Sequence, residues 1–205
     1  MTHKALEVEV KFSVEDQPVP DLAALSEDGQ PATTKEHELS AVYFDTADLR
    51  LLRAAATLRR RTGGKDAGWH LKTSSEKGRM EHHEPLADPQ ASARAEDIPR
   101  PLVELIRDIV KDEPLQKIAR VDNHRVEYAL SDGRGELTDD HVTAWSFLPG
   151  GQRTAWREWE FELAPHIGGT AAGDQLLHAA EELLVAAGAR PAASPSKLAT
   201  ALGRS

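Results

Sequence analysis

No cysteine occurs among the 205 residues of this sequence. That absence excludes disulfide bonds, thiolate catalysis and any zinc site built with sulfur ligands. Long apolar runs are missing too, so no segment has the composition of a membrane-spanning helix. Residues 1–4 lead into a strand-like segment without the features of a signal peptide. We therefore expect a cytoplasmic protein with no membrane partner.

Positive net charge is also lacking, since the formal charge is −9 at pH 7. Proteins that bind nucleic acid generally are usually basic, so we expect no nucleic-acid partner. The cations that are present cluster between residues 50 and 79, which permits a locally basic site for a small phosphorylated ligand. Hydrophobic residues make up 40% of the chain, enough for a packed core, and the length suits one domain over residues 1–205. The sequence leaves the oligomeric state open.

Charged residues alternate with apolar ones in the first strand-like segment, residues 6–12. Alternate side chains of a strand point to opposite faces, so Glu7, Glu9 and Lys11 share one face and the apolar residues share the other. Later segments repeat this pattern at Arg59 and Arg61, at Lys72, and at Glu158, Glu160 and Glu162. Rows of cations and rows of carboxylates along strands favour a site that holds a polyanion together with metal ions.

Strand patterns dominate the chain, and helices lie between them. Roughly eight strands with charges on one face predict an α+β protein built on a closed eight-stranded antiparallel β-barrel, a tunnel with a polar interior and flanking helices. We expect strands at 6–12, 36–44, 56–61, 68–73, 79–84, 117–130, 135–145 and 154–163, and helices at 18–25, 101–111 and 171–187. Gly188 follows the last helix, where a C-terminus favours a residue that can adopt positive φ.

The ordered set of charged motifs resembles the CYTH family, the triphosphate tunnel metalloenzymes. That family opens with Glu-x-Glu-x-Lys, and the resemblance covers nearly the whole chain. The matching motifs are Glu7-x-Glu9-x-Lys11, residues 43–46 (YFDT), residues 58–61 (LRRR), Lys72, Arg79-x-Glu81, Arg125, Glu160-x-Glu162 and the C-terminal Ser196-Lys197.

The resemblance implies a divalent-metal-dependent hydrolase that releases the terminal phosphate of a triphosphate compound, most plausibly inorganic tripolyphosphate. Thiamine triphosphate, longer polyphosphate and nucleotides are other substrates of such a site, whereas an adenylyl cyclase is disfavoured because no adenine-binding element is evident. The implied substrate-binding residues are Lys11, Arg59, Arg61, Lys72, Arg79, Arg125 and Lys197. Catalytic roles fall to Lys11 and Glu81, and the implied ligands of Mg²⁺ or Mn²⁺ are Glu7, Glu9, Asp140, Glu160 and Glu162.

Some positions depart from the family pattern. Asn123 stands where many relatives have a lysine, and His83 stands where another glutamate would be in register. The acidic residue of the penultimate strand could be Glu136, Asp139 or Asp140, of which Asp140 is favoured. These departures keep a rival interpretation open: a polyphosphate-binding module without turnover, such as the CYTH part of a longer CYTH-CHAD protein.

A few prominent side chains receive ordinary structural interpretations. Arg60 points away from its neighbours, which predicts an outer surface residue, and Glu158 is expected at the rim of the tunnel. His70 is interpreted as an ordinary strand residue, and adjacent His82 and His83 cannot face the same way on a strand.

Overall fold

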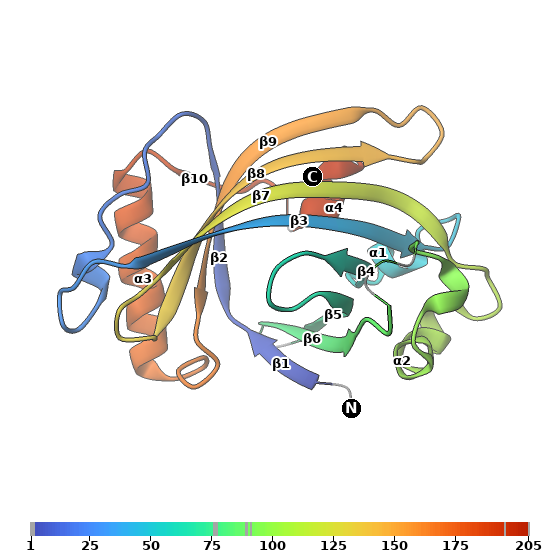
Figure 1. Cartoon of the computed structure of the whole chain (residues 1–205), viewed down its shortest axis with the longest axis horizontal. Helices are drawn as coiled ribbons and strands as arrows, with labels where there is room; N and C mark the ends of the chain where they lie inside the picture. Colours follow the sequence, from blue (N-terminus) through green and yellow to red (C-terminus); the bar gives the residue numbers. More distant parts are fainter. Residues whose placement is uncertain (1–2, 76–77, 89, 91, 195, 205) are drawn as a thin grey trace.

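Antiparallel strands form the body of the protein in the computed structural model (Figure 1). The structure describes residues 3–75, 78–88, 90, 92–194 and 196–204, without the side chains of residues 3–6, 75 and 78–79. The strands of the sheet are β1 (His3–Glu7), β2 (Glu9–Val14), β3 (Thr33–Asp45), β4 (Thr57–Thr62), β5 (Gly68–Ser75), β6 (Gly78–Pro85), β7 (Gln116–Ala129), β8 (Gly135–Ser146), β9 (Arg153–Leu163) and β10 (Arg190–Pro191).

The sheet returns upon itself through a split first strand. Its hydrogen-bonded order is β1-β6-β5-β4-β3-β7-β8-β9-β2-β10. β1 and β2 are consecutive pieces of chain separated by Val8, yet β1 pairs with β6 and β2 pairs with β9. The backbone of Val8 stays attached to the neighbouring strand, because Leu163 N donates to its carbonyl oxygen at 3.0 Å. Chain continuity at Val8 therefore joins β1, at one end of the sheet, to β2, which only the two-residue β10 follows at the other end.

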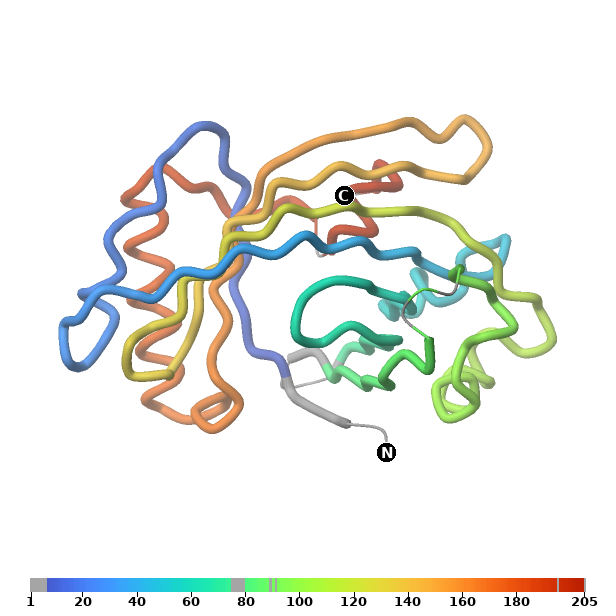
Figure 2. Tube along the Cα trace, viewed as in Figure 1, coloured from blue at the N-terminus to red at the C-terminus, as the bar shows by residue number. Residues whose placement is uncertain are grey.

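The expected barrel is confirmed, with a correction to the strand count. The described sheet has ten strands and its hydrogen-bonded order is open. Counting the β1–β2 stretch as one strand and setting aside the two-residue β10 gives the eight strands expected. Figure 1 shows β3, β7, β8 and β9 arching over β4, β5 and β6, and Figure 2 shows the long neighbours β3 and β7 running side by side.

Two large apolar clusters pack between the sheet and the helices, and charged residues dominate the lining of the interior. Phe12 and Trp159 face away from the interior and pack with Leu184 of a helix, while Leu58 and Leu71 pack under another helix. None of the helices that the structure describes is long and apolar enough to cross a membrane. The helices are α1 (Arg50–Arg53), α2 (Arg100–Val110), α3 (Ala171–Ala186) and α4 (Lys197–Ala201), with 3₁₀ turns η1 (Ala23–Leu25) and η2 (Ala95–Asp97).

Two local predictions need correction. The helix expected at 18–25 is only the turn η1, because Pro18 and Pro20 disfavour helical geometry and the Asp21 carboxylate accepts from Ala23 N at 3.0 Å. Arg60 does lie on the outer face, but it is buried there, and its Nη2 donates to the backbone oxygen of Asp88 at 3.1 Å. The helix end at Gly188 is as expected, with φ +94°.

Candidate functional site

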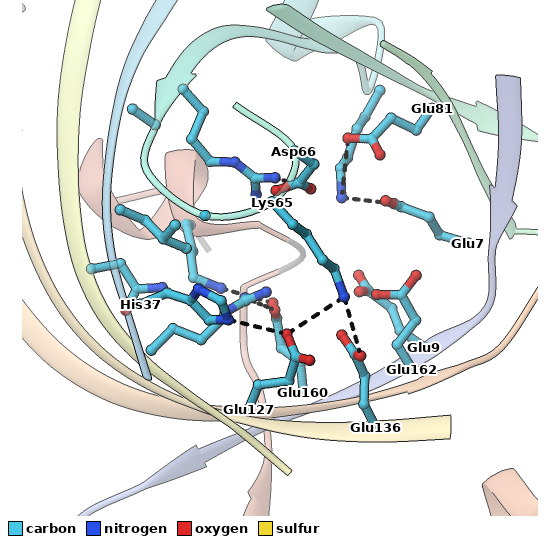
Figure 3. A pocket seen from close by; sticks show the side chains of 18 of the residues that line it. Glu7, Glu9, His37, Lys65, Asp66, Glu81, Glu127, Glu136, Glu160 and Glu162 are labelled. Atoms are coloured by element: carbon cyan, nitrogen blue, oxygen red, sulfur yellow. Dashed lines mark hydrogen bonds and ion pairs between the residues drawn. The ribbon is translucent and has the colours of Figure 1, made fainter. Parts of the chain in front are cut away.

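A cavity of about 400 Å³ lies inside the barrel (Figure 3). Inward-facing side chains from nearly every strand line it, because alternation places the charges of each strand on this face. Its walls include these residues expected from the sequence: Glu7, Glu9, Lys11, Arg59, Arg61, Lys72, Glu81, Arg125, Glu160, Glu162 and Lys197. Asp140 is fully buried behind the wall, and the side chain of Arg79 lies outside the described part of the chain.

The cationic wall of the cavity has hydrogen-bond donors to spare. Arg59 and Arg61 alternate on β4, and Lys72 extends from the adjacent β5. Among the described residues, the buried Nε atoms of Arg59 and Arg61 have no hydrogen-bond partner. Burial and the neighbouring Arg59 lower the pKa of Arg61, which means that positive charge is crowded here. This wall therefore suits an anion with several oxygens.

A row of carboxylates forms the opposite wall. Glu9 of β2 is in register with Glu162 of β9, and Glu162 is in register with Glu136 of β8. Like charges directly opposite one another destabilise a sheet. Burial and the charge of Glu7 raise the pKa of Glu162 to about 8. Burial also raises the pKa of Glu7 to about 7, although Lys72 Nζ lies 2.7 Å from its Oε2.

This carboxylate row fits a hard divalent cation. Mg²⁺ and Mn²⁺ are bound by carboxylate oxygens. Lys72 compensates this negative charge only in part, because the pKa values of Glu7 and Glu162 remain raised by burial and by neighbouring carboxylates. Glu136 lies in this row, whereas sequence reasoning considered it and favoured Asp140 instead. Its carboxylate, with those of Glu9 and Glu162, faces the cavity in Figure 3.

A second carboxylate cluster, made of Asp140, Glu158 and Glu160, is already occupied by an ammonium group. Their oxygens lie within 4.8 Å of one another, close enough to share a metal ion. Lys197 Nζ, however, lies 2.8 Å from Asp140 Oδ2, 2.5 Å from Glu158 Oε1 and 2.9 Å from Glu160 Oε1. The lysine thus stands where a shared metal ion would bind.

Two more cations balance this second cluster. Arg125 makes a two-pronged contact with Asp140 at 2.7 Å per bond and reaches Glu160 at 3.0 Å. Lys11 Nζ lies 2.5 Å from Glu160 and 3.2 Å from Glu158. Against the cost of burial, Lys197 and Arg125 lower the pKa of Asp140 to about 2. Three carboxylates therefore face three cations.

The short helix α4 holds Lys197 in place. The Ser196 hydroxyl accepts from Ala199 N at 3.1 Å, which caps the helix, and Leu198 is buried in an apolar cluster with Ile118. Glu158, expected at the rim, is instead 4% exposed, and its Oε2 accepts from Trp156 Nε1 at 2.7 Å.

Glu81 lies among the cations. Its Oε1 lies 3.9 Å from both Arg59 and Lys72. The Nδ1 of His70 lies 2.9 Å from the same oxygen, a contact that no local sequence pattern predicts. Asn123 lines the cavity as a neutral residue, and its Oδ1 is buried without a hydrogen-bond partner among the described residues.

Lys65 is a cavity residue that sequence reasoning placed only in the general cationic cluster. It extends from the β4–β5 turn across the cavity in Figure 3, where its Nζ lies 3.6 Å from Glu127 and 3.8 Å from Glu136. His37 lies on the same side, 3.4 Å from Glu127. Alternation along β3 and β7 could have identified His37 and Glu127 as inward-facing, but a turn residue such as Lys65 has no such periodic signal.

Comparison with known proteins places these features in a family. The family model described as the CYTH domain matches residues 5–189. The Mycobacterium tuberculosis (strain H37Rv) protein Rv2226 is 39% identical over 213 residues, which cover 97% of this chain and 40% of that protein. The chain therefore spans well under half the length of this relative.

Solved structures show the same fold at low sequence identity. A Bacillus halodurans protein described as a candidate adenylate cyclase has a TM-score of 0.65 and 18% identity, covering 96% of this chain and 97% of its own. The Hippeastrum protein HpAC1, described with a dominant triphosphatase activity, has a TM-score of 0.60 and 21% identity, covering 98% and 97%.

Proposed function

Because this chain belongs to the CYTH domain family, we propose that it is a divalent-metal-dependent hydrolase that releases the terminal phosphate of a triphosphate compound, with inorganic tripolyphosphate as substrate. One observation carries the proposal: a single cavity has a wall of cations with unused donors facing a row of unbalanced carboxylates. A volume of about 400 Å³ is within the usual range for small-molecule sites.

Arg59, Arg61 and Lys72 would bind the phosphate chain. Arginine presents a planar fork to two phosphate oxygens, and lysine supplies a movable point charge. Lys11, Arg125 and Lys197 also line the cavity, but carboxylates already balance their charges, so we expect them to shape the wall more than to attract the anion. Arg79 stays a prediction from the sequence.

Glu7, Glu9, Glu136 and Glu162 would hold Mg²⁺ or Mn²⁺. The chemistry of the donor set fits, since all four are carboxylates that line one cavity, and burial raises the pKa of Glu7, Glu136 and Glu162. A bound divalent ion would neutralise phosphate charge and support the attacking water. Asp140 and Glu160, expected as ligands from the sequence, are engaged by Lys197. Glu81 could orient the water from its position near Arg59 and Lys72.

A binding module without turnover is the second candidate. Asn123 contributes no charge to the cavity, and carboxylates of the second cluster balance three of the seven expected cations, Lys11, Arg125 and Lys197. A site with fewer free cations could bind a polyphosphate without stabilising the charge that develops during hydrolysis. This chain would then act as a polyphosphate-binding part of a longer protein.

Phosphate release from tripolyphosphate tests the proposal. We expect release with Mg²⁺ or Mn²⁺ and none in chelator, with at least about a hundredfold loss in Glu7→Gln and in Arg59→Ala, because each removes charge stabilisation in a buried site. Matched controls are Glu38→Gln and Arg53→Ala, whose side chains are 83% and 59% exposed, outside the cavity. Calorimetric binding of tripolyphosphate is measured in parallel.

The two candidates predict different outcomes. Metal-dependent release that is lost in both cavity variants and kept in both controls supports the hydrolase. Tight binding that Arg59→Ala weakens, without release under either metal, assigns the chain to the binding class. If tripolyphosphate is neither hydrolysed nor bound, both interpretations of the cavity are wrong.

A further inference from the structure

His70 occupies a buried position that the proposed chemistry does not yet use. It lies on β5, two residues before Lys72, so both side chains point to the inner face of the sheet. The residue is 1% exposed and lies behind the cavity wall. A polar ring this deeply buried needs partners for both of its nitrogens, and the structure provides them.

The two ring nitrogens of His70 face different parts of the site. Nε2 lies 2.9 Å from the backbone oxygen of Asp66, in the β4–β5 turn. Nδ1 lies 2.9 Å from Glu81 Oε1, on the neighbouring strand β6. The Asp66 carboxylate in turn contacts the Arg61 guanidinium. One buried ring therefore connects the turn that pairs with Arg61 to the carboxylate beside Lys72.

Hydrogen-bond chemistry fixes how this connection works. The carbonyl oxygen of Asp66 can only accept, so Nε2 carries a hydrogen, and the Nδ1–Oε1 bond requires one further proton shared by His70 and Glu81. Burial lowers the pKa of the ring; Glu81 is also buried, but its bond to His70 and the charge of Lys72 lower its pKa. Both contacts of the ring are therefore within hydrogen-bond distance, Nε2 to the backbone oxygen of Asp66 and Nδ1 to Glu81 Oε1.

We propose that His70 is a positioning residue that fixes Glu81 through Nδ1 and the β4–β5 turn through Nε2, so that both are in place before a triphosphate binds. The inference rests on the proposed function and deepens it. A side chain whose supporting partner is lost can shift by about 1 Å, which costs on the order of a hundredfold in rate at a precisely arranged site. The two contacts separate two effects: Glu81 serves the reaction, and the turn serves binding through Arg61.

Two amide substitutions separate these contacts. Asparagine places its amide nitrogen near the position of Nδ1, so His70→Asn keeps a donor to Glu81 and loses the bond to Asp66. Glutamine places its amide nitrogen near Nε2, so His70→Gln keeps the bond to Asp66 and loses the one to Glu81. The matched control is His124→Asn, a 40% exposed strand histidine whose Nδ1 lies 2.7 Å from Glu38.

Three measurements are made on each variant of the full chain: kcat and KM for tripolyphosphate, tripolyphosphate binding by calorimetry, and amide hydrogen exchange of residues 62–68 without ligand. For His70→Gln we expect kcat to fall about 10- to 100-fold with KM and turn exchange little changed. For His70→Asn we expect about tenfold weaker binding, a matching rise in KM, and faster exchange in the turn. His124→Asn should match the wild type in all three measurements.

The exchange measurement keeps the inference separate from the proposed function. If the wild type neither hydrolyses nor binds tripolyphosphate, the proposed function fails, and faster exchange in His70→Asn alone would still support the fixed turn. Equal exchange in all variants overturns the inference whatever the activity. The inference is also overturned if both His70 variants lose kcat and binding to the same degree, because that result indicates a general loss of order in the site and not two separate contacts.

Discussion

Replacing Lys197 with methionine tests whether this lysine serves as an internal counter-ion. In the native protein its ammonium contacts Asp140, Glu158 and Glu160, and Lys11 and Arg125 complete the balance of charge. Methionine keeps the length and apolar character of the side chain but removes the charge. The Lys197→Met variant therefore holds three carboxylates against two cations in a buried site.

Burial sets the size of the expected loss. The side chains of Lys197 and Asp140 are 10% and 0% exposed, so solvent screens the uncompensated charge poorly. Removing one partner of a buried ion pair costs about 3–5 kcal/mol. In a chain of 205 residues, a loss of that size lowers the thermal midpoint by roughly 6–20 °C, at about 2–4 °C per kcal/mol.

A second substitution should restore much of the stability. Glu158→Gln in the Lys197→Met background returns the cluster to charge balance, and the amide oxygen can still accept from Trp156 Nε1. The assay is urea unfolding of both single variants and the double variant, with exposed Lys35→Met as the control. The counter-ion argument is refuted if Lys197→Met costs less than about 1 kcal/mol while tripolyphosphate binding weakens about tenfold, since that marks a lysine held for the phosphate.

Three further predictions concern the carboxylate row and one tight turn. In chelator, the thermal midpoint should fall as pH rises from 6.5 to 8.5, because the raised pKa values of Glu7 and Glu162 mean that the folded state binds more protons than the unfolded state; a rising midpoint would contradict this. Glu136→Gln should weaken Mn²⁺ binding at least about tenfold in calorimetry, and unchanged affinity would remove it from the metal row. In urea unfolding, Gly63→Ala should destabilise the protein by at least about 1 kcal/mol more than Gly133→Ala. Both glycines have positive φ, but only at Gly63 would an added Cβ collide with a backbone oxygen, that of Glu38. Equal losses of stability would show that this collision does not occur.

Much of the fold is readable from the sequence because strand periodicity is local. Glu7, Glu9 and Lys11 alternate within one short segment, so they share one face, and the cavity lining shows that this is the inner face. Arg59 and Arg61 follow the same rule and do line the cavity. The split at Val8 was not readable, because it depends on which strands the first segment meets on each side, and pairing partners far along the chain carry no local signal.

Which cation contacts which carboxylate could not be predicted from the sequence, for a related reason. Alternation brings Glu136, Thr138 and Asp140 to one face and sends Asp139 outward, where it binds Arg157 at 2.8 Å. The inward carboxylates Glu136 and Asp140 differ in the cation near each of them: Lys65 lies 3.8 Å from Glu136, and Lys197 lies 2.8 Å from Asp140. Lys197 is on a short helix whose position depends on the tertiary packing of Leu198.

Charge balance gives the two carboxylate clusters different physical roles. Asp140 and its neighbours are balanced by three cations from β2, β7 and α4, so binding a metal there would require an ammonium group to leave first. The row formed by Glu7, Glu9, Glu136 and Glu162 has fewer cations among the described residues: Lys72 lies 2.7 Å from Glu7, and the exposed Lys65 lies 3.8 Å from Glu136. Since a divalent ion releases most free energy where negative charge is least compensated, we propose the row of Glu7, Glu9, Glu136 and Glu162 as the metal site in preference to the compact cluster of Asp140, Glu158 and Glu160. This proposal ranks the two clusters by the negative charge that lysine and arginine leave uncompensated, and not by how closely the carboxylates lie to one another.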